Sequence, residues 1–215
     1  MNAYVEAPVS PLAMGHVALD MDVFPMDNSQ THKEGVSYTY KGYDGYAPIA
    51  AYLGQEGWCL GCELRPGSQH ANNGFLDTLK RVLPRARSLT DKPILLRLDS
   101  AHDARDNRDF LREQDQIDFL IKWNPRKQDP LAWANKAQAK EVWSLDRDGK
   151  MEAVLSEDLP DEPGLRRIVK VTVRTSDASG QLYLEPEVSI EGWITSLPAD
   201  VASEQHIMAL YSDHA

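Results

Sequence analysis

Two short and almost continuously apolar segments of this chain each lead into an aspartate. Residues 17–21, VALDM, are followed by Asp22, and residues 94–98, ILLRL, are followed by Asp99. Strands with so few polar positions are typical of a sheet covered on both faces, in which neighbouring strands often run parallel. If these two strands are parallel neighbours, both carboxylates emerge at the same edge of the sheet. The pattern therefore predicts a paired-acid site at that edge.

Paired carboxylates, with no histidine or cysteine in the set, predict a site for hard divalent cations. Oxygen ligands of this kind suit Mg²⁺ or Mn²⁺. Two such ions about 4 Å apart stabilise the attacking and the leaving oxygen of a phosphoryl transfer. Asp22 and Asp99 only partly neutralise two divalent ions, so a third carboxylate is expected. Asp20 is a further candidate ligand because it shares a strand face with Asp22, and its alternative role is to hydrogen-bond a turn.

The patterns up to about residue 124 predict a mixed sheet packed by helices. In chain order after residues 17–21 we expect strands at 46–53 and 57–64, a helix from Phe75 that ends or bends at Pro84, the strand at 94–98, a helix at 103–114 and a strand at 117–123. This succession favours an α/β architecture of the RNase H-like type. We therefore assign residues 1–124 to the first part of such a core.

The character of the chain changes at about residue 125. Four strand-like segments follow, at 141–145, 151–155, 167–175 and 182–197, and in the third of them valines alternate with polar residues. We interpret residues 125–198 as a mainly antiparallel β insertion subdomain, whose final strand can rejoin the core. Residues 199–215 then begin an amphipathic helix that the sequence cuts off, the start of a truncated C-terminal helix.

The charge balance excludes a small basic DNA-binding module. Lysine and arginine number 23 against 33 aspartates and glutamates, a net charge of −10. Residues 80–97 and 122–140 are nevertheless locally basic, so contact with a polyanion stays open. Solvated surface is the alternative interpretation of both stretches. No apolar run approaches the roughly 20 residues needed to cross a bilayer, and no signal peptide is evident, so we expect a soluble cytoplasmic protein.

Cysteine and histidine carry weaker signals. Cys59 and Cys62 form a C-x-x-C motif without the second pair that a structural zinc site needs, so we interpret them as buried or half-buried thiols without function. His70 and His102 show no metal-ligand spacing with a second histidine. We interpret both as hydrogen-bonding surface residues.

The segments HVALDMDVFPMDNSQTHKEG, YKGYDGYAPIAAYLGQEGWCLGCELRPGSQHANNGF, ILLRLDSAHDARDNRDFL and DFLIKWNPRK resemble the catalytic domain of DDE transposases from bacterial insertion sequences. The similarity covers about residues 15–127. It returns at 192–211, where WITSLPADVASEQHIMALYSDH is similar to the strand and helix entry before the third acid of that family. The resemblance implies an RNase H-like fold with a β insertion ahead of the last catalytic helix.

By this resemblance Asp22 is the first catalytic acid and Asp99 the second. The third acid of the family is a glutamate in a tyrosine, arginine, glutamate signature, which here begins at Tyr211. The family spacing puts that glutamate a few residues beyond Ala215, and His214 stands at the arginine position. We therefore expect this chain, as given, not to complete the active site.

The resemblance also implies the reaction and its partners. With Mg²⁺ or Mn²⁺ on the two aspartates, the family hydrolyses a phosphodiester at each end of the insertion sequence, and the freed 3′ hydroxyl then attacks target DNA. Lys122, Arg126 and Lys127 are candidates to hold DNA phosphates. Such a transposase is expected to act as a homodimer associated with the nucleoid, with no membrane partner.

Two alternatives remain open. VALDMDV also matches the strand that opens haloacid dehalogenase-like phosphatases, with Asp20 as nucleophile, Asp22 as general acid, and Asp99 with Asp103 as the Mg²⁺ site. That fold should continue with helices and a parallel sheet, whereas residues 38–64 are patterned as an antiparallel hairpin. The second alternative is a non-catalytic transposase relic that binds DNA or another subunit.

Overall fold

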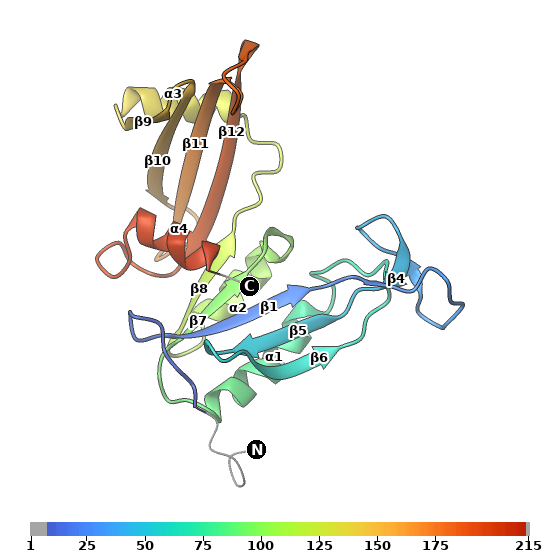
Figure 1. The fold of residues 1–215 in the computed structure, drawn as a ribbon. Coiled ribbons are helices and arrows are strands. Elements are labelled where there is room, and N and C mark those ends of the chain that lie inside the picture. The colour runs from blue at the N-terminus through green and yellow to red at the C-terminus, as the bar shows by residue number, and fades with distance from the viewer. Residues whose placement is uncertain (1–7, 214–215) are drawn as a thin grey trace. The chain divides into compact units, whose positions relative to one another are not determined.

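The computed structural model describes residues 8–213, which form two compact units. The first unit extends to Ile121 and the second comprises Lys122–Asp213. Figure 1 shows the helices and strands of both.

A five-stranded mixed sheet forms the centre of the first unit. Its spatial order is β6 (Trp58–Glu63), β5 (Ile49–Leu53), β1 (Val17–Val23), β7 (Ile94–Leu98) and β8 (Ile117–Lys122). β5 runs antiparallel to β1 and to β6, whereas β1, β7 and β8 are parallel. This is the strand arrangement of the RNase H-like fold, and the expectation of a mixed α/β sheet is confirmed.

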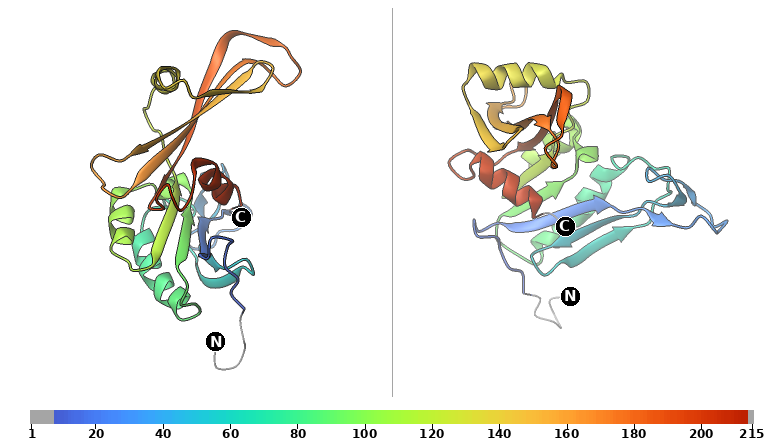
Figure 2. Two further views of the ribbon diagram at one scale, coloured as in Figure 1. Left: turned by 90° about the vertical axis from the view of Figure 1, so that its left-hand side faces the viewer. Right: turned by 45° about the horizontal axis from the view of Figure 1, so that its top comes forward.

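The alternation of large apolar residues with other residues along β1 determines which face of the sheet belongs to the core. Val17, Leu19 and Met21 are fully buried, and they stand in register with Ile94, Leu96 and Leu98 of β7. The helices α1 (Phe75–Arg87) and α2 (Arg105–Arg112) lie on one side of the sheet, and a 3₁₀ turn, η1 (Ser100–His102), precedes α2 (Figure 2). β1 therefore buries one face completely and carries its acidic residues on the other.

Helix α1 continues for one turn beyond the position where we expected it to end. Pro84 lies inside it, and the helix runs to Arg87. Proline removes the hydrogen bond to the carbonyl of Lys80, but both residues are exposed, so water can satisfy that carbonyl. Burial of Ala86 in the last turn then holds the helix past the proline.

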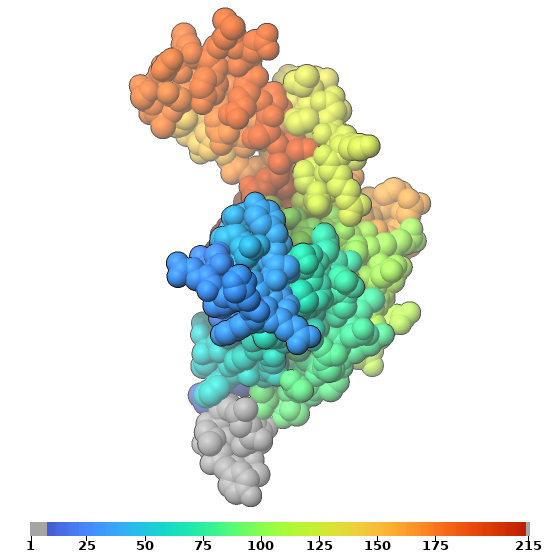
Figure 3. Space-filling model, turned by 90° about the vertical axis from the view of Figure 1, so that its right-hand side faces the viewer, coloured from blue at the N-terminus to red at the C-terminus, as the bar shows by residue number. Residues whose placement is uncertain are grey.

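A small antiparallel sheet follows the carboxyl end of β1. Its order is β2 (Met26–Asp27), β4 (Asp44–Tyr46) and β3 (Ser37–Tyr38). Gly67 packs so closely on it that an added Cβ would stand 2.1 Å from the Ser37 carbonyl oxygen. The small sheet, blue in Figure 3, lies on the viewed side of the first unit. The single strand expected at 46–53 is thus divided between β4, which ends at Tyr46, and β5, which begins at Ile49. Pro48 lies in the interruption, and its carbonyl accepts from the Phe24 amide.

The second unit is an antiparallel sheet with one helix across it. The sheet order is β12 (Leu182–Thr195), β11 (Arg166–Ser176), β10 (Lys150–Asp158) and β9 (Trp143–Arg147). Val169 and Val171 of β11 are fully buried, as the alternating pattern predicts. The antiparallel β subdomain expected before the last helix is therefore confirmed as part of the fold.

Helix α3 (Pro130–Ala139), which we did not expect, packs against β10, β11 and β12. Asp129 caps its N-terminus by accepting from the Leu131 amide at 3.0 Å, and Pro130 occupies the first helical turn. Asp-Pro is a helix-start signal that was present in the sequence. Only Trp133 and Ala137 are buried along this helix, so the apolar periodicity was too short to stand out.

The last helix, α4 (Glu204–Ser212), begins five residues after the expected start at residue 199. Ser203 caps it by accepting from the His206 amide at 3.2 Å. His214, which the resemblance aligns with the signature arginine, lies outside the described residues. Within residues 8–213 no helix is long and apolar enough to span a membrane.

The buried face of β7 yields a stability prediction. Leu96→Ala should lower the free energy of unfolding by about 2–5 kcal/mol, because Leu96 is fully buried between β1 and β8. Leu64→Ala is the matched control in the same unit, since Leu64 is 63% exposed. Urea denaturation of the full chain measures both. Equal losses in the two variants would contradict the assignment of this face as the core.

Candidate active site

Asp22 and Asp99 lie side by side at the carboxyl ends of β1 and β7. The parallel register pairs Asp20 with Arg97 and Met21 with Leu98, so Asp22 and Asp99 are the next residues on the two strands. Residues in register on parallel strands point to the same face of the sheet. The structure therefore brings the two aspartates together at one sheet edge, as the sequence pattern predicts.

Each of the two carboxylates makes a local hydrogen bond. Asp22 is exposed, and its Oδ1 accepts from the Val23 amide at 2.6 Å. Asp99 caps η1, and its Oδ1 accepts from the Ala101 amide at 3.2 Å. Its side chain is 40% exposed. Both carboxylates are thus oriented by the backbone and accessible from solvent.

His102 is not the surface residue that we expected. It is fully buried, and its ring stacks on Phe75 with centroids 4.1 Å apart. Burial, together with the positive charge of Arg65 and the nearby His70, lowers the pKa of His102 to about 3. The Nε2 atom lies 3.6 Å from Oδ1 of Asp99. A neutral imidazole therefore stands behind Asp99 at neutral pH and adds no positive charge to the site.

Asp20 has a different environment from Asp22, although both belong to β1. Its two oxygens accept from Nε and Nη2 of Arg97 at 2.6 and 2.7 Å. The Asp20 side chain is 15% exposed and that of Arg97 is 5% exposed. A paired and largely buried carboxylate is poorly placed for a metal ion, so the geometry favours Asp22 and Asp99 as the ligand pair.

The same environment argues against the phosphatase alternative. Asp20 would be the nucleophile there, yet its carboxylate is held by Arg97. Asp103 would be a metal ligand, yet it is buried and paired with Arg108. The antiparallel β5 and β6 also follow β1 in place of the helix that such a fold requires.

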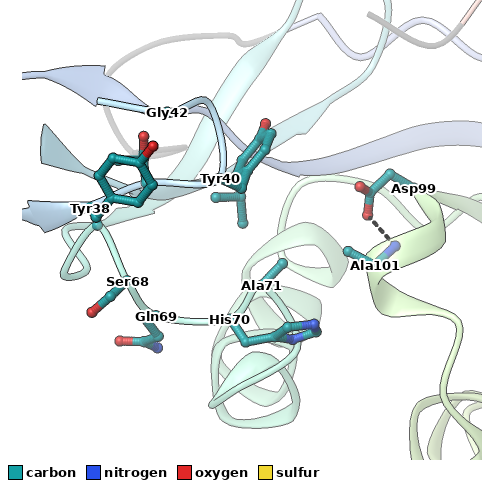
Figure 4. A pocket seen from close by; sticks show the side chains of 12 residues that line it. Tyr38, Tyr40, Gly42, Ser68, Gln69, His70, Ala71, Asp99 and Ala101 are labelled. Atoms are coloured by element: carbon teal, nitrogen blue, oxygen red, sulfur yellow. Dashed lines mark hydrogen bonds between the residues drawn. The ribbon is translucent and has the colours of Figure 1, made fainter. Parts of the chain in front are cut away.

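A cavity of about 600 Å³ opens beside the acid pair. Tyr38 and Tyr40 line one side and Ser68, Gln69 and His70 the other (Figure 4). The wall also includes Asp99, Ala101 and Val23. The cavity thus lies at the carboxyl ends of β1 and β7, where open α/β sheets commonly bind ligands.

Tyr40 is a site residue that we did not predict. Partial burial of its hydroxyl, the negative charges of Asp22 and Asp99, and the neighbouring Tyr43 raise its pKa, although the residue as a whole is 70% exposed. Both aspartates are therefore within electrostatic range of this hydroxyl. A signal was available, since residues 38–46 contain four tyrosines among nine positions.

The carboxylates of Asp22 and Asp99 meet only part of what a divalent-cation site needs. Two adjacent, accessible carboxylates suit Mg²⁺ or Mn²⁺. Among residues 8–213, however, no three histidine, cysteine, aspartate or glutamate side chains gather as a metal site. Asp22 and Asp99 are thus two candidate ligands, one fewer than such a cluster contains.

Lys122 does not have the free side chain expected of a phosphate contact. Within the second unit its ammonium pairs with Glu191 and lies 4.4 Å from the ring centroid of Trp193 and 5.2 Å from that of Tyr211. Its side chain is 21% exposed. The surroundings of Lys122 therefore indicate a packing role.

Arg126 and Lys127 lie in an exposed turn between β8 and α3. Arg126 has a left-handed backbone with φ of 49°, and its amide donates to Oδ1 of Asn124 at 3.1 Å. Both side chains extend from a turn that is held by the backbone. Of the three predicted cations, these two remain accessible to a polyanion.

Cys59 and Cys62 are free and exposed, so the expectation of buried thiols is wrong. A register shift on β6 places Cys59 opposite Tyr52 and Cys62 opposite Ala50. Tyr52 and Ala50 point to one face of β5, so both thiols point to that face. They lie outside the cavity beside Asp99.

No protein of curated function is significantly similar in sequence. A cryo-EM structure of piggyBac transposase, a synaptic complex with hairpin DNA, is similar with 12% identity and a TM-score of 0.45. The similarity covers 95% of this chain and 38% of that one, so this chain spans well under half the length of that transposase.

A family model described as transposase DDE domain group 1 matches residues 6–157. The match contains both aspartates of the site and extends over more than half of the chain. This chain therefore belongs to the family of transposases with a DDE domain of group 1.

Proposed function

We propose that this chain is the catalytic domain of a DNA transposase that cleaves phosphodiesters at the ends of a bacterial insertion sequence and joins them to target DNA. One observation carries the proposal: in a chain of this family, Asp22 and Asp99 each come directly after the last register pair of the parallel strands β1 and β7, Met21 with Leu98. Neither a nucleophilic side chain nor an acid–base pair is needed for such chemistry, which depends on positioning and charge.

In this proposal Asp22 and Asp99 hold Mg²⁺ or Mn²⁺. A bound divalent ion supplies activation of water and neutralisation of phosphate charge. The amides of Val23 and Ala101 keep the two carboxylates oriented through the hydrogen bonds already described. We expect the third carboxylate of the family to follow α4 in the chain, as the resemblance implies.

DNA is the proposed partner, and Arg126 and Lys127 are its proposed phosphate contacts. Their exposure supports this role, whereas the Lys122 side chain is only 21% exposed. We further propose that residues 1–124 provide the core, 125–198 the insertion and 199–215 the start of the catalytic helix. Action as a homodimer stays a prediction.

The metal role of the acid pair is tested by Mn²⁺ titration followed by electron paramagnetic resonance. Asp22→Asn and Asp99→Asn should each weaken Mn²⁺ binding by at least about 10-fold, because each removes an ionised oxygen ligand. The control is Asp77→Asn, an exposed aspartate on α1. Unchanged Mn²⁺ affinity in both site variants would exclude the proposed metal pair.

Asp20 should behave as a structural residue. Asp20→Asn leaves the buried guanidinium of Arg97 without its anionic partner, so the free energy of unfolding should fall by about 3–5 kcal/mol. Asp22→Asn, two residues away but exposed, should change it by less than about 1 kcal/mol. Urea denaturation of both variants tests the difference, and a larger loss for Asp22→Asn would reverse these roles.

The two exposed cations should act through DNA affinity. Replacing Arg126 and Lys127 together by alanine should reduce the slope of log affinity against log salt by about 2, because each phosphate contact contributes about 0.9. Lys122→Ala should leave that slope unchanged and lower the stability of the second unit by about 1 kcal/mol. Titrations of a random-sequence duplex at several salt concentrations measure the slopes. If Lys122→Ala lowers the slope and the Arg126 and Lys127 double variant does not, the assignment of these two residues as phosphate contacts is wrong.

A further inference from the structure

The cavity beside the acid pair presents two aromatic rings that the fold does not bury. Tyr38 is 67% exposed and Tyr40 is 70% exposed, and both line the cavity whose wall contains Asp99. Large aromatic side chains normally bury most of their surface. Two such rings side by side at one cavity indicate a ligand with flat faces.

The backbone that carries these tyrosines is held in place. Between them, Thr39 is 1% exposed, and both its amide and its Oγ1 donate to the carbonyl of Tyr43 at 2.8 Å. The hydroxyl of Tyr43 in turn donates to the carbonyl of Pro25 at 3.1 Å. The two rings are therefore presented by an ordered turn, so little conformational entropy is lost when a ligand stacks on them.

The facing wall supplies hydrogen-bonding groups. Ser68, Gln69 and His70 run along the side opposite the tyrosines in Figure 4. The amide nitrogen of Gln69 donates to the carbonyl of Asn73 at 2.9 Å, which orients that side chain. An aromatic platform opposite amide, hydroxyl and imidazole groups suits a nucleobase, which combines flat faces with a polar edge.

The charges near the cavity favour the base of a nucleotide over its phosphate as the group that contacts the rings. Asp22 and Asp99 repel a phosphate unless a cation lies between, whereas an uncharged base meets no such repulsion at the aromatic rings. Next to these rings, the ammonium of Lys41 lies 5.5 Å from the ring centroid of Tyr40 and can approach a backbone phosphate. The volume of about 600 Å³ leaves room for more than a single base.

We propose that Tyr38 and Tyr40 stack on unpaired bases of the DNA strand next to the phosphodiester held at Asp22 and Asp99. This inference rests on the proposed function and adds to it the two residues that position the strand. Duplex DNA keeps its base faces covered, so the strand must be locally unpaired to engage the rings. Stacking tolerates any base, so these tyrosines contribute affinity and positioning without sequence readout.

The test uses the full chain, without divalent metal, and a 12-nucleotide single strand that contains the fluorescent base 2-aminopurine. Tyr40→Ala and Tyr38→Ala should each weaken binding about 5- to 150-fold, the range found for loss of one stacked base. Tyr40→Phe should stay within about twofold of wild type, because the stacking face remains. Tyr183→Ala is the control, since Tyr183 is a partly exposed tyrosine on β12 outside the cavity.

The fluorescence of 2-aminopurine reports stacking separately from affinity. It should be quenched by the wild-type chain and by Tyr40→Phe, and much less by the alanine variants. Wild-type affinity and quenching in both alanine variants, or equal losses in Tyr40→Phe and Tyr40→Ala, would overturn stacking. If stacking is overturned in this way but the wild-type chain still binds a duplex of the same sequence, the transposase proposal stands. If it binds neither form of DNA, both proposals fail.

Discussion

The parallel pairing of β1 with β7 is the constraint on which the candidate site depends. The first five residues of β1, from Val17 to Met21, are each matched to one on β7, and the match ends with Met21 against Leu98. Asp22 and Asp99 come next, so their proximity follows from the register. A shift of one residue would turn one of them to the other face of the sheet. The core side chains on one face thus hold the acids in place on the other.

The ion pair between Asp20 and Arg97 reinforces this register from the polar face. It joins the two strands one position before the buried pair of Met21 and Leu98. Asp20 is therefore neutralised within the sheet, whereas Asp22 and Asp99 remain accessible at its edge. Tyr40 lies in the turn between β3 and β4, where partial burial of its hydroxyl and the negative charges of those two carboxylates raise its pKa.

Basic residues in the second unit show why charge in a sequence is a weak guide to a DNA surface. Lys122 pairs with Glu191 and packs on two rings. Arg167 pairs with Glu157 and lies 4.5 Å from the ring centroid of Trp123. Such cations support the fold of the unit. Composition counts them together with the exposed Arg126 and Lys127, because it records charge without recording burial or packing.

The sequence by itself determined the mixed sheet, the antiparallel β subdomain and the two aspartates at strand ends, because apolar alternation and strand length are local properties of the chain. It did not reveal α3, whose buried stripe is only two residues, or the burial of His102, which depends on Phe75 packing against it from another helix. Only the tertiary structure separated Asp20 from Asp22 and gathered Tyr38 and Tyr40 beside Asp99. Those distinctions arise from contacts between residues dozens of positions apart, which no local pattern encodes.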